Sequence, residues 1–215
     1  MSDIRGWVAQ DTVYAADEGT RIGVKTSKMG HLVLIDWFTQ MALEGRAYHV
    51  RAGTLSVPLV GDAPLADQSA EMCADCTLGT TIVPAYVNVS VNLGTGTLHE
   101  YAAKSIGSVS TAGTAFVPLP VMIGGAVATT TARVDAAGAV SVGAEAATTT
   151  RRHWAVSNPV AVAAGHGITT HEWNPVEAPT LVGPSCFYVQ IAATTTGPSY
   201  FASFDYIELT TASVS

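Results

Sequence analysis

The sequence predicts an all-β protein, an antiparallel β-sandwich of about eight to ten strands that follows an extended N-terminal arm. The stretch 55–209 carries this expectation, because Thr, Ser, Val, Ala, Gly and Pro dominate it and Leu-rich helical patterns are nearly absent. Thr and Val are β-branched residues that suit a pleated surface. Gly and Pro recur at short intervals, as they do in the turns that join successive strands.

The chain divides into two unequal parts. Its 215 residues suffice for one large sandwich with an arm. Residues 1–30 carry mixed charge with little periodicity, which predicts an extended arm with one short strand at 20–26. Residues 31–215 are expected to form a single β-sandwich domain, because no linker and no internal repeat divides them.

The arm has too few apolar residues for a core of its own, so it is expected to dock on a neighbouring subunit. Trp7 is the strongest anchor, because a Trp side chain buries a large area. The expected interface residues of the arm are Ile4, Trp7, Val8, Val13 and Tyr14.

Residues 32–45 form the one region with a helical pattern. Residues 32–35 are expected as strand, followed by one irregular or helical turn. Ile35, Phe38 and Met41 are spaced by roughly one helical turn. Gly45 stands where a helix would end, since Gly adopts the left-handed conformation that closes helices.

Apolar and polar residues alternate from Ala47 onward, which is the period of a β-strand. One strand is expected to contain Tyr48, Val50, Leu55, Val57 and Leu59. The clearest strand is 81–92, with one face made of Val83, Ala85, Val87, Val89 and Val91. Residues 92–97 hold two Gly and predict a hairpin turn into a returning strand at 99–109.

Further strands are expected at 71–77, 115–123, 129–142, 152–162, 178–181, 186–193 and 201–209. Within 129–142, Gly138 indicates a hairpin that joins Val134 to Val140. The total is the strand count of a jelly-roll sandwich.

Charged residues make up 13% of the chain and hydrophobic residues 48%. Such low charge indicates that much of the surface is covered, by copies of the chain or by a larger assembly. The alternative is a monomer with a neutral surface rich in Ala, Thr and Ser. The net charge of −7 offers no basic face for phosphates, so nucleic acid is not expected as a partner.

Neither membrane association nor secretion is expected. The longest apolar runs are interrupted by Gly, Pro or Thr within about ten residues, which is too short for a membrane span. The N-terminus lacks the basic and apolar regions of a signal peptide. Synthesis in a cytoplasm is therefore the expectation.

Three cysteines occur, two of them in a C-x-x-C motif. A zinc site would need a second pair or nearby His ligands, which Cys76 lacks. Cys73 and Cys76 lie in a predicted strand, where residues three apart point to opposite faces. We therefore interpret Cys73, Cys76 and Cys186 as buried free thiols, with a metal or redox role as the alternative.

The tightest group of potential metal ligands is His166, His171 and Glu172. Its spacing does not match the helical H-E-x-x-H motif, so a loop between strands is the preferred interpretation and no metal is expected. Two carboxylate pairs, Glu71 with Asp75 and Asp62 with Asp67, lack any pattern that would place them across a cleft. No catalytic residue, cofactor or enzyme activity is predicted.

The large aromatic residues are expected in the core or in an interface, because each buries a large area. They are Trp7, Trp37, Trp154, Trp173, Tyr200, Phe201, Phe204 and Tyr206. The alternative is a platform for carbohydrate on a shallow β-surface.

The stretch Leu78-Gly79-Thr80-Thr81-Ile82-Val83-Pro84-Ala85-Tyr86-Val87-Asn88-Val89 and the closing strand at 201–208 resemble jelly-roll structural proteins of viruses and bacteriophages. The resemblance covers roughly residues 45–210 and is one of style and strand order, without a specific motif. No functional residue can be transferred from it.

The resemblance implies a capsid shell, vertex or decoration subunit that is made in the host cytoplasm and incorporated in the virion. Its expected partners are copies of itself, as a trimer or pentamer, and other capsid subunits. The alternative is a receptor- or glycan-binding β-sandwich of the tail-fibre or adhesion type. A metal-dependent enzyme built on His166, His171 and Glu172 is the third hypothesis.

Overall fold

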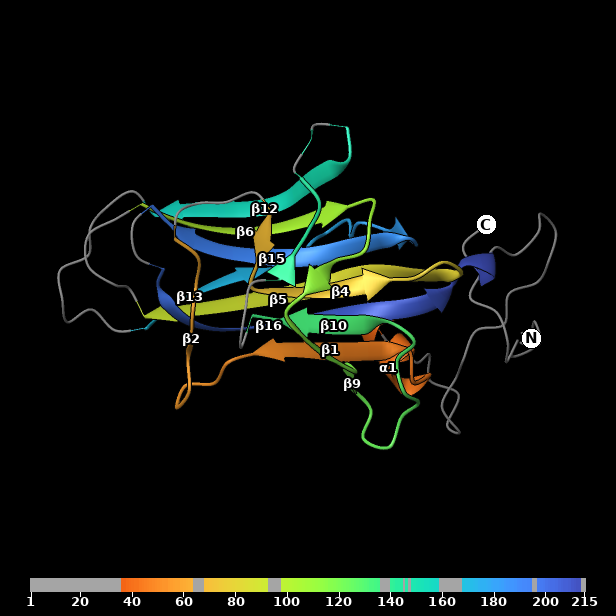
Figure 1. Ribbon diagram of the computed structural model, residues 1–215. Coiled ribbons are helices and arrows are strands. Elements are labelled where there is room, and N and C mark those ends of the chain that lie inside the picture. Colours follow the sequence, from red (N-terminus) through yellow and green to blue (C-terminus); the bar gives the residue numbers. More distant parts are fainter. Residues whose placement is uncertain are drawn as a thin grey trace, which may run out of the picture.

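The computed structural model describes residues 36–63, 68–92, 98–135, 140–144, 146, 148–158, 168–194 and 197–213 (Figure 1). The arm and its five predicted interface residues, the predicted strands at 20–26 and 32–35, and His166 lie outside this part of the chain. The described residues are mostly β-strand in antiparallel sheets, so the all-β prediction is confirmed.

Eight strands in the described part of the chain have five or more residues, and they form the body of the molecule. They are β1 (Ala47–Ala52), β4 (Met72–Cys76), β5 (Thr80–Asn92), β6 (His99–Ile106), β12 (Thr150–Asn158), β13 (Ile168–Trp173), β15 (Ser185–Ala193) and β16 (Ser199–Thr210). The shorter elements are α1 (Trp37–Leu43), β2 (Leu59–Val60), β3 (Ser69–Ala70), β7 (Thr111–Ala112), β8 (Thr114–Phe116), β9 (Leu119–Pro120), β10 (Thr131–Val134), β11 (Val140–Ser141), β14 (Leu181–Val182) and η1 (Thr211–Ser213).

The long strands pair in a nested antiparallel order. The first of them, β1, pairs with the last, β16, and the second, β4, pairs with the second-last, β15. Inside these pairs, β5 pairs with β13 and β6 pairs with β12. The pairing of β16 with β5 joins the first and third pairs into one sheet, and that of β15 with β6 joins the second and fourth into another.

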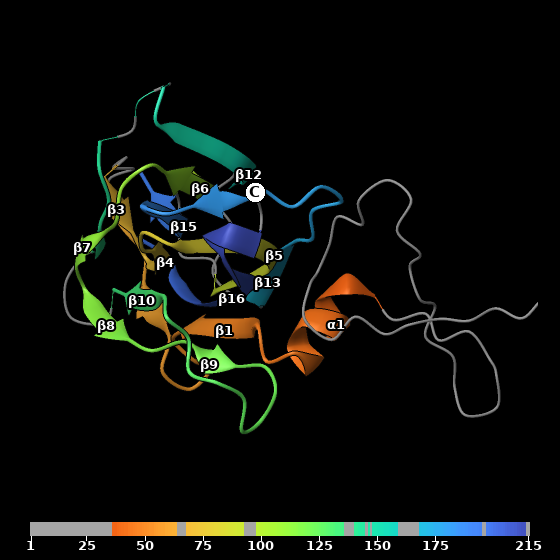
Figure 2. The same ribbon diagram turned by 90° about the vertical axis from the view of Figure 1, so that its right-hand side faces the viewer.

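Two sheets result, and they face each other across one core (Figures 1 and 2). The seven-stranded sheet has the order β13-β5-β16-β1-β9, with β14 beside β5 and β2 beside β16. The six-stranded sheet has the order β12-β6-β15-β4-β10-β8. Because side chains alternate along a strand, alternate residues of the long strands enter the core, as Val87, Phe187 and Phe204 do.

Helix α1 covers one end of the outer face of the seven-stranded sheet. Asp36 caps its first turn by accepting a hydrogen bond from the backbone N–H of Thr39. Met41 packs on Val83 and Ile207 of the sheet. The helix ends at Leu43, and Gly45 follows with a φ of +72°, so the predicted stop at Gly45 is confirmed.

A β-bulge in β5 changes which residues face the core. Asp205 lies opposite Tyr86, whereas the next residue of β16, Tyr206, lies opposite Pro84, so Ala85 is the extra residue. The prediction that the five alternating apolar residues of 81–92 share one face is therefore wrong at its start. Val83 packs outside, under α1, while Val87, Val89 and Val91 are in the core.

Three predicted connections are also wrong. Strand β1 ends at Ala52, because Gly53 turns the chain with a φ of +66° and leaves Leu55 and Val57 exposed. Strand β6 is not the hairpin partner of β5, since it belongs to the other sheet. Strands β10 and β11, predicted as one hairpin, likewise belong to different sheets.

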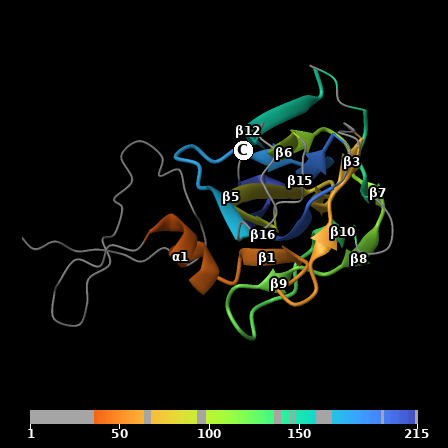
Figure 3. The same cartoon turned by 90° about the vertical axis from the view of Figure 1, so that its left-hand side faces the viewer.

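A three-stranded sheet, in the order β3-β11-β7, covers part of the outer face of the six-stranded sheet. Figures 2 and 3 show its outer strands β3 and β7 at one side of the two main layers. Ala70, Val140 and Val142 from this region pack on residues of β4, β6 and β15. The residues that they cover are Cys73, Ile106, Cys186 and Tyr188.

Candidate functional site

The candidate metal ligands His171 and Glu172 do not converge. They are consecutive in β13 and therefore point to opposite faces of the sheet. The ring of His171 stacks on Tyr101 between the sheets, with a centroid distance of 4.9 Å, and burial lowers its pKa. Glu172 lies on the outer face, where its Oε1 accepts a hydrogen bond from Asn88.

The three cysteines are free and buried, which confirms their interpretation. Cys76 faces the main core, and Cys73 points to the opposite side. Cys73, Cys186 and Asp75 bring one potential ligand atom each within 4.8 Å of one another, a grouping that sequence analysis missed. Burial raises the pKa of Cys186 well above its usual value, and the neighbouring Cys73 adds to this effect.

Asp75 has hydrogen-bond donors on both of its oxygens. Its Oδ1 accepts from the backbone N–H of Ser110 at 2.7 Å, and its Oδ2 accepts from the Ser110 hydroxyl at 2.8 Å and from Arg133 Nε at 3.3 Å. The grouping of Cys73, Asp75 and Cys186 is thus a satisfied polar cluster, and it holds the outer face of the six-stranded sheet to the segment at Ser110.

The paired carboxylates considered from the sequence do not face each other across a cleft. Glu71 is fully buried, and its two oxygens accept hydrogen bonds from the backbone N–H groups of Asp62 and Ile191. Burial raises the pKa of Glu71 well above its usual value, with the charge of Asp62 as the second cause. Glu71 thus links the backbone at Asp62 to the backbone at Ile191. Asp67 lies outside the described residues.

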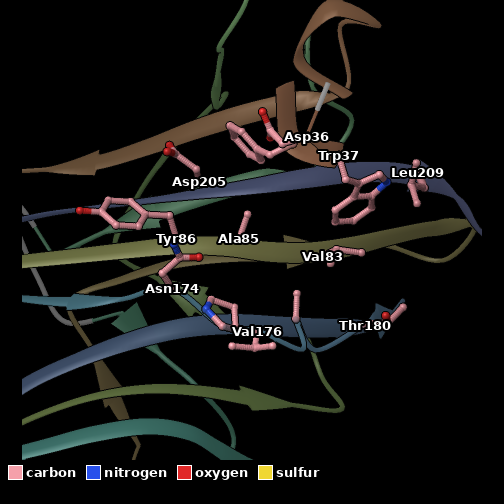
Figure 4. A pocket seen from close by; sticks show the side chains of 13 residues that line it. Asp36, Trp37, Val83, Ala85, Tyr86, Asn174, Val176, Thr180, Asp205 and Leu209 are labelled. Carbon is pink, nitrogen blue, oxygen red and sulfur yellow. The ribbon is translucent and has the colours of Figure 1, made fainter. Parts of the chain in front are cut away.

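A groove of about 760 Å³ lies on the outer face of the seven-stranded sheet (Figure 4). Strands β5 and β16 form its floor, with Val83, Ala85 and Asp205. Helix α1 forms one wall, and the segment 174–180 forms the other. The bulge at Ala85 contributes to the groove, because it turns Val83 and Ala85 outward. Sequence analysis missed the groove as a site, since four separate segments build it.

Aromatic side chains stand near the two ends of this groove. Trp37 is 45% exposed and lies beside Leu209, whereas Tyr86 lies toward the other end, beside Asn174 (Figure 4). Trp37 therefore lies outside the core, and its place in an interface, the other position predicted for the large aromatic residues, stays a prediction. The predicted core position is confirmed for Tyr200, Phe204 and Tyr206.

The polar groups of the groove are held by neighbours on the sheet. Asp205 Oδ1 lies 2.6 Å from His49 Nδ1. The Tyr86 hydroxyl accepts a hydrogen bond of 3.3 Å from Asn88 Nδ2. Beyond Tyr86 a row of hydrogen bonds continues across the open sheet face, through Asn88 to Ser90 and from Ser90 to Thr170. This network keeps Tyr86 and Asp205 in fixed orientations.

A second surface feature is a run of exposed apolar residues around β9, which we call the apolar segment 117–127. Its exposed members are Val117, Leu119, Val121, Met122, Ile123 and Val127. Ile123 is fully exposed. Because β9 is the last strand of its sheet, the segment also lies at a sheet edge.

Comparisons with protein-family models, with curated proteins and with solved structures found no match. In the part of the chain that the structure describes, no helix has the length and apolarity needed to cross a membrane.

Proposed function

We propose that this protein is a jelly-roll structural subunit that assembles with copies of itself, as a capsid shell, vertex or decoration protein of a virus or bacteriophage. The nested strand order carries this proposal. A jelly roll is an antiparallel ribbon of four strand pairs that is wound so that alternate pairs fall in opposite sheets. The pairs β1–β16, β4–β15, β5–β13 and β6–β12 have this relation.

The apolar segment 117–127 is the proposed contact surface between copies. Six large apolar side chains are exposed within eleven consecutive residues, and concentrated apolar exposure on soluble proteins marks interaction sites. A contact between copies would bury Ile123 and its neighbours without removing charged groups from water, which is costly. The arm is proposed as a second contact between subunits, through Ile4, Trp7, Val8, Val13 and Tyr14.

The expected assembly is a trimer or pentamer, alone or within a shell, in the virion. Contacts with other capsid subunits are part of the proposal, and contacts with nucleic acid are not, since the net charge is −7.

Sedimentation velocity of the full chain tests this function. The wild type is expected to sediment as a multiple of the 22.2 kDa monomer. The double variant Val121→Ser/Ile123→Ser is expected to shift toward monomer, because it removes apolar area from the contact. The matched control is Leu78→Ser/Val182→Ser, two exposed apolar residues elsewhere on the surface, which should assemble normally. A monomeric wild type, or a double variant that assembles as the wild type does, contradicts the proposal.

A further inference from the structure

The groove on the outer face of the seven-stranded sheet has features that assembly through the segment 117–127 does not require. It combines a half-exposed Trp, a Tyr and two carboxylates along one open channel. We propose that this groove binds a neutral oligosaccharide. The inference rests on the lining of the groove and is independent of the proposed assembly.

The aromatic residues fit the apolar faces of sugar rings. A pyranose ring presents C–H groups on its faces, and these pack on the electron-rich face of an indole or phenol ring. Trp37 exposes nearly half of its surface at one end of the groove, and Tyr86 lies toward the other end (Figure 4). Two aromatic positions along one channel suit a chain of several sugar units better than a single compact ligand.

The polar residues fit the hydroxyl groups of the same ligand. Asp205 uses Oδ1 with His49, and its Oδ2 has no hydrogen-bond partner among the described residues. A carboxylate oxygen accepts hydrogen bonds from hydroxyl groups strongly, because the acceptor is charged. Asn174 and Thr180 line the opposite wall and add an amide and a hydroxyl.

The lining of the groove disfavours anionic ligands and purely apolar ligands. Its described lining contains Asp36 and Asp205 and contains no Lys, Arg or His. Phosphorylated, sulfated and sialylated compounds would therefore meet like charge without a compensating cation. A purely apolar ligand would desolvate Asp205 without giving it a hydrogen bond, which is costly.

The floor of the groove also disfavours a peptide strand. Peptides that add to a sheet bind at its edge, where backbone groups are free. Here the floor is a sheet face in which β5 already pairs with β16 and with strands on its other side. Recognition must therefore come from side chains, and the side chains present are those that suit a sugar.

Isothermal titration calorimetry of the full-length protein tests this inference. The neutral probes are cellotetraose, maltotetraose and tetraacetylchitotetraose, and the anionic probe is a heparin tetrasaccharide. At least one neutral probe is expected to bind, and its affinity is expected to fall by about tenfold or more in Trp37→Ala and in Asp205→Asn. Circular dichroism melting of each variant establishes that it is folded.

The matched control is Glu177→Gln, which removes one negative charge from an exposed residue of the same wall that does not line the groove. It should bind as the wild type does. The inference is overturned if no neutral probe binds, if both groove variants retain wild-type affinity, or if the heparin tetrasaccharide binds as tightly. None of these outcomes bears on the oligomeric state, which sedimentation measures separately.

Discussion

The two outer faces of the sandwich differ in what covers them. The outer face of the six-stranded sheet lies partly under a third sheet, and it buries Cys73, Cys186 and the carboxylate of Asp75, which pairs with the partly exposed Arg133. The outer face of the seven-stranded sheet carries the short helix α1 at one end and leaves the rest open as a groove and a polar row. The same strand order thus builds one outer face that is largely covered and one that is largely open.

Substitution of one carboxylate on each face, Asp75 and Asp205, should give the largest difference in the free energy of unfolding. Asp75→Asn leaves Arg133 and the Ser110 N–H without their charged acceptor in a buried site, so we expect a loss of about 3 kcal/mol in the free energy of unfolding. Asp205→Asn should cost less than about 1 kcal/mol, because the His49–Asp205 pair is partly exposed. Urea denaturation followed by circular dichroism measures both. Equal losses in the two variants would contradict the difference between the faces.

Thiol labelling should distinguish the covered outer face from the core between the sheets. Cys73 and Cys186 lie beneath the three-stranded sheet, whereas Cys76 lies between the two large sheets. Local opening of the small sheet should expose the first two without global unfolding. We therefore expect Cys73 and Cys186 to become accessible to the reagent before Cys76 does, although burial raises the pKa of both Cys186 and Cys76.

Mass spectrometry of the peptides after timed alkylation measures this order. Reaction of all three thiols at one rate would show that the small sheet opens only when the whole molecule unfolds.

A smaller effect is expected at His171, which is half-buried at the side of the core. The Nε2 atom of His171 is buried without a hydrogen-bond partner, so His171→Phe removes an unsatisfied group while keeping the stack on Tyr101. We expect a gain of about 1 kcal/mol at neutral pH.

The substitution His171→Phe should also change how stability depends on pH. Burial lowers the pKa of His171 below its usual value of 6.5, so between that folded pKa and 6.5 the unfolded state binds more protons than the folded state does. Stability of the wild type therefore falls as the pH falls below 6.5. The variant should show a shallower fall, with His99 and His153 retaining part of it, since burial also lowers their pKa values. An unchanged slope in urea denaturation across this range would contradict a pKa of His171 lowered by its partial burial.

Sequence patterns correctly predicted the strands and turns that depend only on neighbouring residues. Examples are the β-branched run of β5, the apolar alternation of β16 and the helix stop at Gly45. The alternation also predicted that Cys73 and Cys76 point to opposite faces. The strand partners were not predictable in this way, because pairs such as β1 with β16 join residues at opposite ends of the domain.

The positions of the candidate sites depend on which distant strands pair and on the register in which they pair. Asp75 meets Cys186 because the two residues are partners across β4 and β15, a relation that no spacing in the sequence reveals. The groove combines the start of α1, the bulge of β5, the segment 174–180 and the end of β16. One signal was available, since Pro84 within a strand indicates a bulge or an edge, and a bulge reverses which residues face outward.

Negative-stain electron microscopy of the purified full-length protein tests the proposal that this β-sandwich is a jelly-roll assembly subunit. We expect closed shells or discrete rings of three or five copies. Uniform particles of the size of one 22.2 kDa chain, at every concentration tested, would contradict it.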